Sequence, residues 1–135
     1  MSLFVQQRFA GDCQVACLAM FLGVSYDAVA KHVWGSELIH GLADGRDKHI
    51  AALFEVEIGA KDISKLRRKN PAVLTVPSLN DPNGSRHVVY WDGKRVWDPL
   101  QGVQGKKTYT NQRAWKLATE GFQKASRRKR KAPPD

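Results

Sequence analysis

The stretch that decides the fold of this chain is GDCQVACLAMFL, at residues 11–22. Residues 15–22 contain only apolar side chains and a cysteine, so they predict a helix that is buried on most of its surface. Asp12 can cap the start of this helix, because its carboxylate accepts from the N–H groups that open a helix. Gly23 suits the position just after its end. We therefore expect the domain to pack around a helix at residues 12–22.

Cys13 falls in the first turn of this helix. The partial positive charge of a helix start stabilises a thiolate, which is the nucleophilic form of cysteine. The alternative is that Cys13 is an inert packing residue, which is the commoner state of a lone free cysteine. Cys17, one turn later and inside the apolar run, fits that alternative well. Cys13 is the candidate nucleophile if a suitable base lies elsewhere in the chain.

The composition is that of one globular domain. The chain has 135 residues, of which 42% are hydrophobic and 26% are charged, enough for a single core. It contains no apolar stretch long enough to span a membrane, and its first residues lack the pattern of a signal peptide. No histidine lies within eight residues of either cysteine, so we expect no metal and no other cofactor. Two cysteines four residues apart predict free thiols in a reducing compartment, the cytoplasm.

The net charge of +9 is concentrated at the C-terminus. We expect residues 1–123 to form one domain. Residues 124–135, with six basic residues and one acidic residue, are expected to form a disordered tail. Within this tail, residues 124–131 could bind nucleic acid or an acidic partner. If the protein is an effector inside a eukaryotic host cell, the same run could direct it to the nucleus.

The apolar residues change from a helical to a strand-like period near residue 70. Before that point, helices are predicted at residues 12–22, 25–33, 46–55 and 63–69. After it, strands are predicted at residues 72–76, 86–91, 94–98 and 106–109, with a last helix at residues 111–121. Helices followed by an antiparallel sheet indicate an α+β domain.

His87 and Asp98 supply the base that a nucleophilic cysteine needs. They lie on two strands that flank Asp92 and Gly93, and a two-residue turn there would place them nearly opposite each other, about 5 Å apart. At that separation a carboxylate can orient an imidazole, as in a nucleophilic triad. Taken singly, His87 could be a half-buried strand residue and Asp98 an ordinary strand-end carboxylate. Together with Cys13 they form a candidate Cys-His-Asp site.

These motifs, taken in order, resemble the papain-like cysteine peptidases that remove bacteriocin leader peptides after a double glycine. The resemblance extends from residue 5 to about residue 115, and its motifs are Gln7, GDCQVACLAM at residues 11–20, RHVV at residues 86–89, and DP at residues 98–99 followed by Gly102. It implies a papain-like fold and a peptidase that hydrolyses a peptide or isopeptide bond. Members of that family are best known as N-terminal domains of ABC exporters, whereas we expect this chain to be a stand-alone protein.

The resemblance also implies a role for each site residue. Cys13 would be the nucleophile, His87 the general base and Asp98 the group that orients His87. Gln7, six residues before Cys13, would donate to the oxyanion together with the backbone N–H of Cys13. The chain departs from the family pattern at Gln14, where the family has glycine, and a side chain there could narrow the cleft.

The sequence is also compatible with two other functions. The chain could be a non-catalytic binding module on the same fold that uses its basic tail to bind nucleic acid or an acidic protein. Gln14 and the tail favour this alternative. It could also be a cysteine acyltransferase or amidase, because an acyl-enzyme can pass to acceptors other than water. The presence of Gln7, Cys13, His87 and Asp98 favours the peptidase and the acyltransferase.

Overall fold

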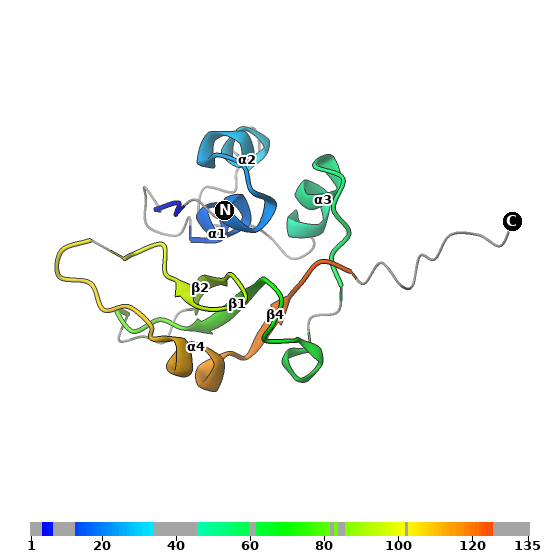
Figure 1. The fold of residues 1–135 in the computed structure, drawn as a ribbon. Coiled ribbons are helices and arrows are strands. Elements are labelled where there is room, and N and C mark those ends of the chain that lie inside the picture. Colours follow the sequence, from blue (N-terminus) through cyan, green and yellow to red (C-terminus); the bar gives the residue numbers. More distant parts are fainter. Residues whose placement is uncertain are drawn as a thin grey trace, which may run out of the picture.

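A four-stranded antiparallel sheet carries helices on both of its faces (Figure 1). The computed structural model describes residues 4–6, 13–33, 46–59, 62–81, 83, 86–101 and 103–125. In chain order the elements are α1 (Cys13–Leu22), α2 (Tyr26–Val33), α3 (Arg46–Leu53), the 3-10 turn η1 (Ile63–Lys65), β1 (Ala72–Pro77), β2 (Arg86–Trp91), β3 (Val96–Trp97), α4 (Asn111–Leu117) and β4 (Glu120–Phe122). The strand order is β3-β2-β1-β4. This is the α+β class that the sequence predicts.

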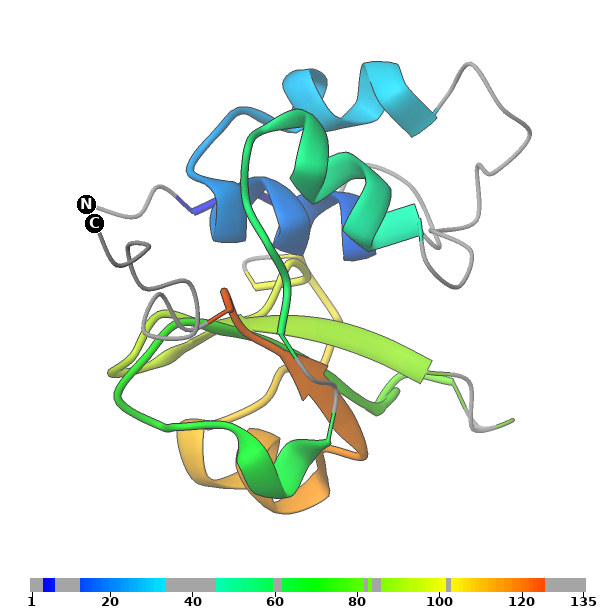
Figure 2. The same ribbon diagram turned by 90° about the vertical axis from the view of Figure 1, so that its right-hand side faces the viewer.

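The two faces of the sheet bury two separate apolar clusters. α1, α2 and α3 lie on one face, and α4 and η1 lie on the other (Figure 2). Alternate strand residues supply each cluster, as expected for a sheet that is covered on both sides. The cluster under α1 takes from the strands Val73, Val88, Tyr90 and Phe122. The cluster under α4 takes Ala72, Leu74, Val76, Val89, Trp91 and Val96.

α1 is buried along almost its whole length. Every residue from Val15 to Phe21 is at most 4% exposed, as the continuous apolar run predicts. The helix ends with a hydrogen bond from Val24 N–H to the Ala19 carbonyl at 3.0 Å. Gly23 has a φ of 74°, a left-handed conformation that glycine adopts without strain. The predicted end of this helix at Gly23 is confirmed.

The C-terminal part of the domain differs from the prediction. α4 ends at Leu117, and the chain then forms β4 beside β1 instead of continuing as a helix to residue 121. Gly121 permits this pairing, because a Cβ added there would lie 2.7 Å from the Val73 carbonyl oxygen. The second edge of β1 needs a hydrogen-bonding partner, and this tertiary requirement overrides the helical pattern of the local sequence.

The turn between β2 and β3 is wider than predicted. Trp91 pairs with Val96, whereas the predicted two-residue turn would pair it with Lys94. The Asp92 side chain holds the wider turn by accepting from two of its backbone N–H groups, both at 2.8 Å. A shift of two residues leaves each side chain on its original face of the sheet. The wider turn therefore moves Asp98 along β2 without turning it to the opposite face.

Two predicted elements are shortened or replaced by irregular chain. The helix expected at residues 63–69 is reduced to η1, because the backbone after it bonds to a side chain instead of to itself. The Gln123 amide accepts from Arg67 N–H at 3.0 Å and donates to the Arg67 carbonyl at 2.7 Å. Residues 106–109, predicted as a strand, form irregular chain.

Lys124 and Ala125 belong to the domain, although the sequence assigned them to the tail. Lys124 pairs with Ile58, and the N–H of Ala125 donates to the Glu57 carbonyl at 2.8 Å. The rest of the predicted tail lies outside the described residues. Within the described ranges, no single helix is long and apolar enough to cross a membrane. α1 and most of α2 meet those criteria only when taken together, and the chain bends by 119° between them.

We predict that Gly121→Ala destabilises the domain by about 1–3 kcal/mol, the usual cost of overpacking a filled site. The new methyl would lie 2.7 Å from the Val73 carbonyl oxygen and 2.9 Å from the side chains of Leu66 and Leu74. Urea unfolding measures the effect. Gly59→Ala is the control, because its methyl would meet the nearest atom at an ordinary 3.5 Å. Equal losses of stability in the two variants would contradict this account of β4.

Candidate active site

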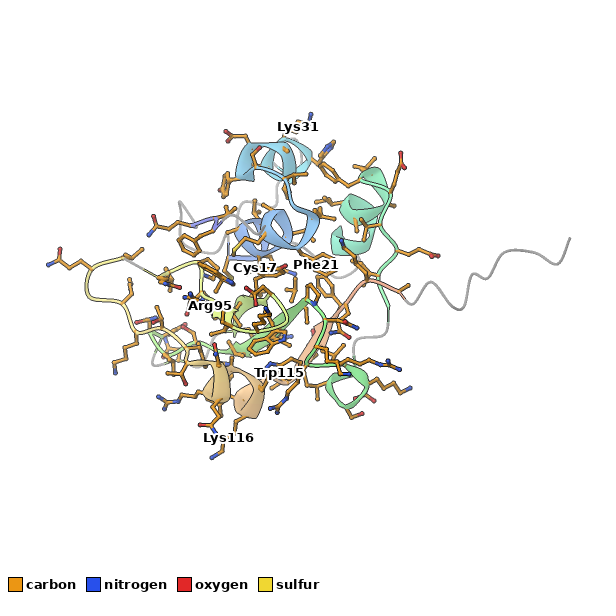
Figure 3. The ribbon with its side chains drawn as sticks, in the orientation of Figure 1. Cys17, Phe21, Lys31, Arg95, Trp115 and Lys116 are labelled. Atoms are coloured by element: carbon orange, nitrogen blue, oxygen red, sulfur yellow. The ribbon has the colours of Figure 1, made fainter. Side chains whose placement is uncertain are left out.

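A hydrogen bond between α1 and β2 sets the position of Cys13. The thiol of Cys17, which lies fully buried between α1 and the sheet (Figure 3), donates to the Val88 carbonyl oxygen at 3.3 Å. This contact holds α1 against β2 at Val88, the residue that follows His87. Cys13 lies about 5.4 Å before Cys17 along the helix axis, because one helical turn separates them. Cys17 is a buried core residue, as predicted, whereas Cys13 is half-buried.

His87 contacts both of the other members of the predicted triad. Its Nε2 donates to Asp98 Oδ1 at 2.7 Å, and the Cys13 thiol lies close enough to the ring to raise its pKa. Because Nε2 is bonded to Asp98, Nδ1 is the ring nitrogen that can exchange a proton with a reacting group. The structure therefore brings Cys13, His87 and Asp98 together, with the imidazole between the thiol and the carboxylate.

Asp98 is a buried carboxylate whose oxygens accept from donors in its own loop. The residue is only 1% exposed. Besides His87, the N–H of Leu100 donates to Oδ1 at 2.9 Å, and the N–H of Tyr109 donates to Oδ2 at 3.3 Å. The Tyr109 hydroxyl donates to the Pro77 carbonyl at the end of β1, which ties the loop to the sheet. Burial of a carboxylate requires such donors. Sequence reasoning missed Tyr109, because its contact with Asp98 is made by the backbone.

Trp97, the residue before Asp98, is held by three neighbours. Its indole N–H donates to Asp92 Oδ2 at 2.8 Å. The guanidinium carbon of Arg95 lies 4.1 Å from a Trp97 ring centroid, and the Phe4 ring centroid lies 5.9 Å away. These contacts restrict the ring and with it the backbone that presents Asp98 to His87.

The segment before α1 runs beside the turn that follows Asp98. Gln6 Nε2 donates to the Gln101 carbonyl oxygen at 3.2 Å. Gln7, the predicted oxyanion donor, lies outside the described residues, as does Asp12 at the predicted helix start. The contact of Gln6 shows that the residue just before Gln7 lies at the Asp98 loop.

The surroundings of His87 favour its protonated form. Burial alone would lower the pKa of His87. The hydrogen bonds to Asp98 and Cys13, with the charges of these two groups, outweigh burial and raise the pKa from 6.5 to about 9. At neutral pH the ring is then an imidazolium, with a proton on each nitrogen.

The arrangement is suited to nucleophilic attack on a carbonyl group. The half-buried sulfur can form a covalent bond to carbon, and Nδ1 of His87 can move a proton to or from the reacting atoms. Across the described ranges, no three His, Cys, Asp or Glu side chains form a group that could hold a metal ion. The chemistry that these residues offer is that of Cys13 assisted by His87.

We predict that a low dose of iodoacetamide at mildly acidic pH labels Cys13 and spares Cys17. Cys13 is half-buried beside an imidazolium, whereas Cys17 is fully buried and bonded to Val88. Intact-mass analysis should show a single adduct, and peptide mapping should locate it. Cys13→Ala should remove the adduct, and His87→Gln should slow its formation. Equal labelling of the two cysteines, or labelling of Cys17 alone, would refute the assignment.

We predict that Asp98→Asn lowers the pKa of His87, because it removes the hydrogen bond and the charge that Asp98 contributes to the imidazolium. An NMR titration of the ring should give a pKa near 9 in the wild type and a clearly lower value in the variant. Asp62→Asn is the control, since Asp62 bonds to Ser64 within its own turn. A His87 pKa that is the same in Asp98→Asn and in the wild type would show that Asp98 does not act on the ring.

Protonated His87 should make the stability of the domain depend on pH. Folding raises the pKa of His87 from 6.5 to about 9. The contribution of His87 to the free energy of unfolding is therefore complete below pH 6.5 and is lost as the pH rises through 9. The shift corresponds to a contribution on the order of 3 kcal/mol. Urea unfolding should show a stability gap between the wild type and His87→Gln that narrows toward alkaline pH. A stability gap that widens as the pH rises would contradict this prediction.

No known protein family matches the chain, and no curated protein shows a significant similarity to its sequence.

Proposed function

We propose that this chain is a papain-like cysteine peptidase that hydrolyses a peptide or isopeptide bond in a reducing compartment such as the cytoplasm. The observation that carries the proposal is the arrangement of His87, whose ring bonds to Asp98 Oδ1 at 2.7 Å and lies close enough to the Cys13 thiol for that group to raise its pKa. The order of the elements supports it as well. The nucleophile opens a buried helix, and the base lies on the antiparallel sheet against which that helix packs.

In the acylation step, the Cys13 thiolate attacks the carbonyl carbon of the scissile bond and forms a C–S bond. The carbonyl oxygen becomes an oxyanion, and its collapse breaks the C–N bond. Nδ1–H of His87 gives its proton to the leaving amine. Asp98 keeps the ring oriented throughout by accepting from Nε2. The products of this step are a free amine and a thioester on Cys13, with His87 neutral.

In the deacylation step, neutral His87 takes a proton from a water molecule through Nδ1. The water oxygen attacks the thioester carbonyl carbon, and the C–S bond then breaks. A carboxylic acid leaves, and the thiolate and the imidazolium are restored. One water molecule is consumed for each bond cleaved.

The oxyanion donors in this proposal are the backbone N–H of Cys13 and the side chain of Gln7. Cys13 is the first residue of α1, and the first N–H groups of a helix have no acceptor within the helix. Gln6, at the Asp98 loop, leads directly into Gln7. Gln14 is half-buried, and in this proposal its side chain narrows the space beside the sulfur.

The test is cleavage of a peptide library prepared from a digested proteome, with the new termini identified by mass spectrometry. The wild type should create new termini at a consistent set of sequences, and Cys13→Ala should create none. Gln7→Ala should lower kcat by about 10²–10³-fold on a peptide chosen from these, the usual loss for one oxyanion donor. Gln6→Ala is the matched control, because Gln6 donates to Gln101, and it should retain most of the activity.

The same experiment separates the alternatives. If cleavage in the presence of a simple amine yields amides instead of acids, the chain is an acyltransferase on the same triad. If Cys13 reacts with iodoacetamide but no library peptide is cut, the peptidase proposal is wrong. If Gln6→Ala and Gln7→Ala lose equal activity, the oxyanion assignment of Gln7 is wrong.

A further inference from the structure

An open basic pocket lies across the sheet from α1. Its volume is about 840 Å³, and it is lined by Arg68, Thr110, Gln112, Arg113, Lys116 and Leu117. Figure 3 shows Lys116 on α4, on the opposite side of the molecule from Lys31 on α2. The pocket therefore belongs to the α4 face and is separate from Cys13 and His87. Three of its six lining residues are cations and none is acidic.

Arg68 is held in place by the core beneath it. Its carbonyl accepts from the Trp91 indole N–H at 2.7 Å, and its guanidinium carbon lies 4.9 Å from a Trp115 ring centroid. Trp91 and Trp115 in turn pack edge to face, with ring centroids 5.6 Å apart. An arginine that is already ordered loses less conformational entropy when it binds an anion. The pocket is thus formed before a ligand arrives.

The cations of the pocket have no carboxylate partner among the described residues. Within the part of the chain that the structure describes, neither Arg68, Arg113 nor Lys116 forms an ion pair with a carboxylate. The two segments that supply the lining, residues 63–71 and 106–118, contain eight basic residues and no acidic residue. The positive field therefore extends beyond the pocket along both segments.

We propose that the α4 face binds the phosphate backbone of a double-stranded nucleic acid, with Arg68, Arg113 and Lys116 contacting phosphates. A duplex carries closely and regularly spaced charges that match an extended set of cations. Thr110 and Gln112 add neutral donors, which commonly contact phosphate oxygens. The proposal concerns a second activity and does not depend on catalysis by Cys13.

The lining favours a duplex over the other anionic partners. Binding of an acidic protein usually depends on aromatic or large apolar anchors, and Leu117 is the one apolar residue of the lining. Single strands are held mainly by bases stacked on exposed aromatic rings. Trp91 and Trp115 are both buried, so they offer no such platform.

The test is the salt dependence of binding of the full chain to a short fluorescent DNA duplex of arbitrary sequence. Each phosphate contact contributes about 0.9 to the slope of log Kobs against log salt concentration. Lys116→Gln should therefore reduce the slope by about 1, and Arg113→Gln with Lys116→Gln by about 2. Lys31→Gln removes the same single charge from α2 and is the matched control. It should leave the slope nearly unchanged.

Every variant retains the basic residues at 127–131, so any contribution of these residues is the same in all of them. Cys13→Ala should bind the duplex as the wild type does, which separates this inference from the proposed catalysis. Equal effects of Lys31→Gln and Lys116→Gln would show a general charge effect and overturn the proposal. The absence of duplex binding at low salt would also overturn it. The proposal would also be overturned if the α4 variants lost binding to poly-glutamate but retained binding to the duplex.

Discussion

Burial of α1 is the constraint on which the rest of the structure depends. From Val15 to Phe21 the helix has no side chain that favours water, so it must be covered on every side. The sheet covers one side, and α2 packs against it as well. The hydrogen bond from Cys17 to Val88 then fixes the position of the helix along β2. The position of Cys13 beside His87 is thus a consequence of how the core is packed.

The second constraint is the charge of Asp98. A carboxylate that is 1% exposed is costly unless donors surround it, and its donors come from β2 and from the loop that follows β3. This long loop has no regular structure between β3 and α4, yet it is tied to β1 through Tyr109. The same carboxylate, together with Cys13, raises the pKa of His87 to about 9. One buried group therefore shapes both the loop and the charge state of the base.

The sheet separates two surfaces of different chemistry. At the start of α1, a thiol lies beside an imidazole and a carboxylate in a site that suits nucleophilic catalysis. On the α4 side, arginine and lysine side chains line an open pocket with no acidic neighbour. Because α1 and α4 lie on opposite faces of the sheet (Figure 1, Figure 2), a ligand bound to α4 would not cover α1. The net charge of +9 is thus shared by the folded domain and is not a property of the tail alone.

The sequence by itself determined the elements that follow from local periodicity: α1 with its end, α2, β1 and β2, and the α+β class. It also singled out Cys13, His87 and Asp98, because their residue types and their places near element ends are local features. Only the tertiary structure decided that β4 replaces the end of the helix predicted at residues 111–121, since Gly121 becomes a strand residue by lying against β1. Only the tertiary structure showed that Tyr109 bonds to Asp98 and that Arg68 and α4 line one pocket. These features are contacts between segments distant in the chain, and no local pattern encodes which distant segment will supply the partner.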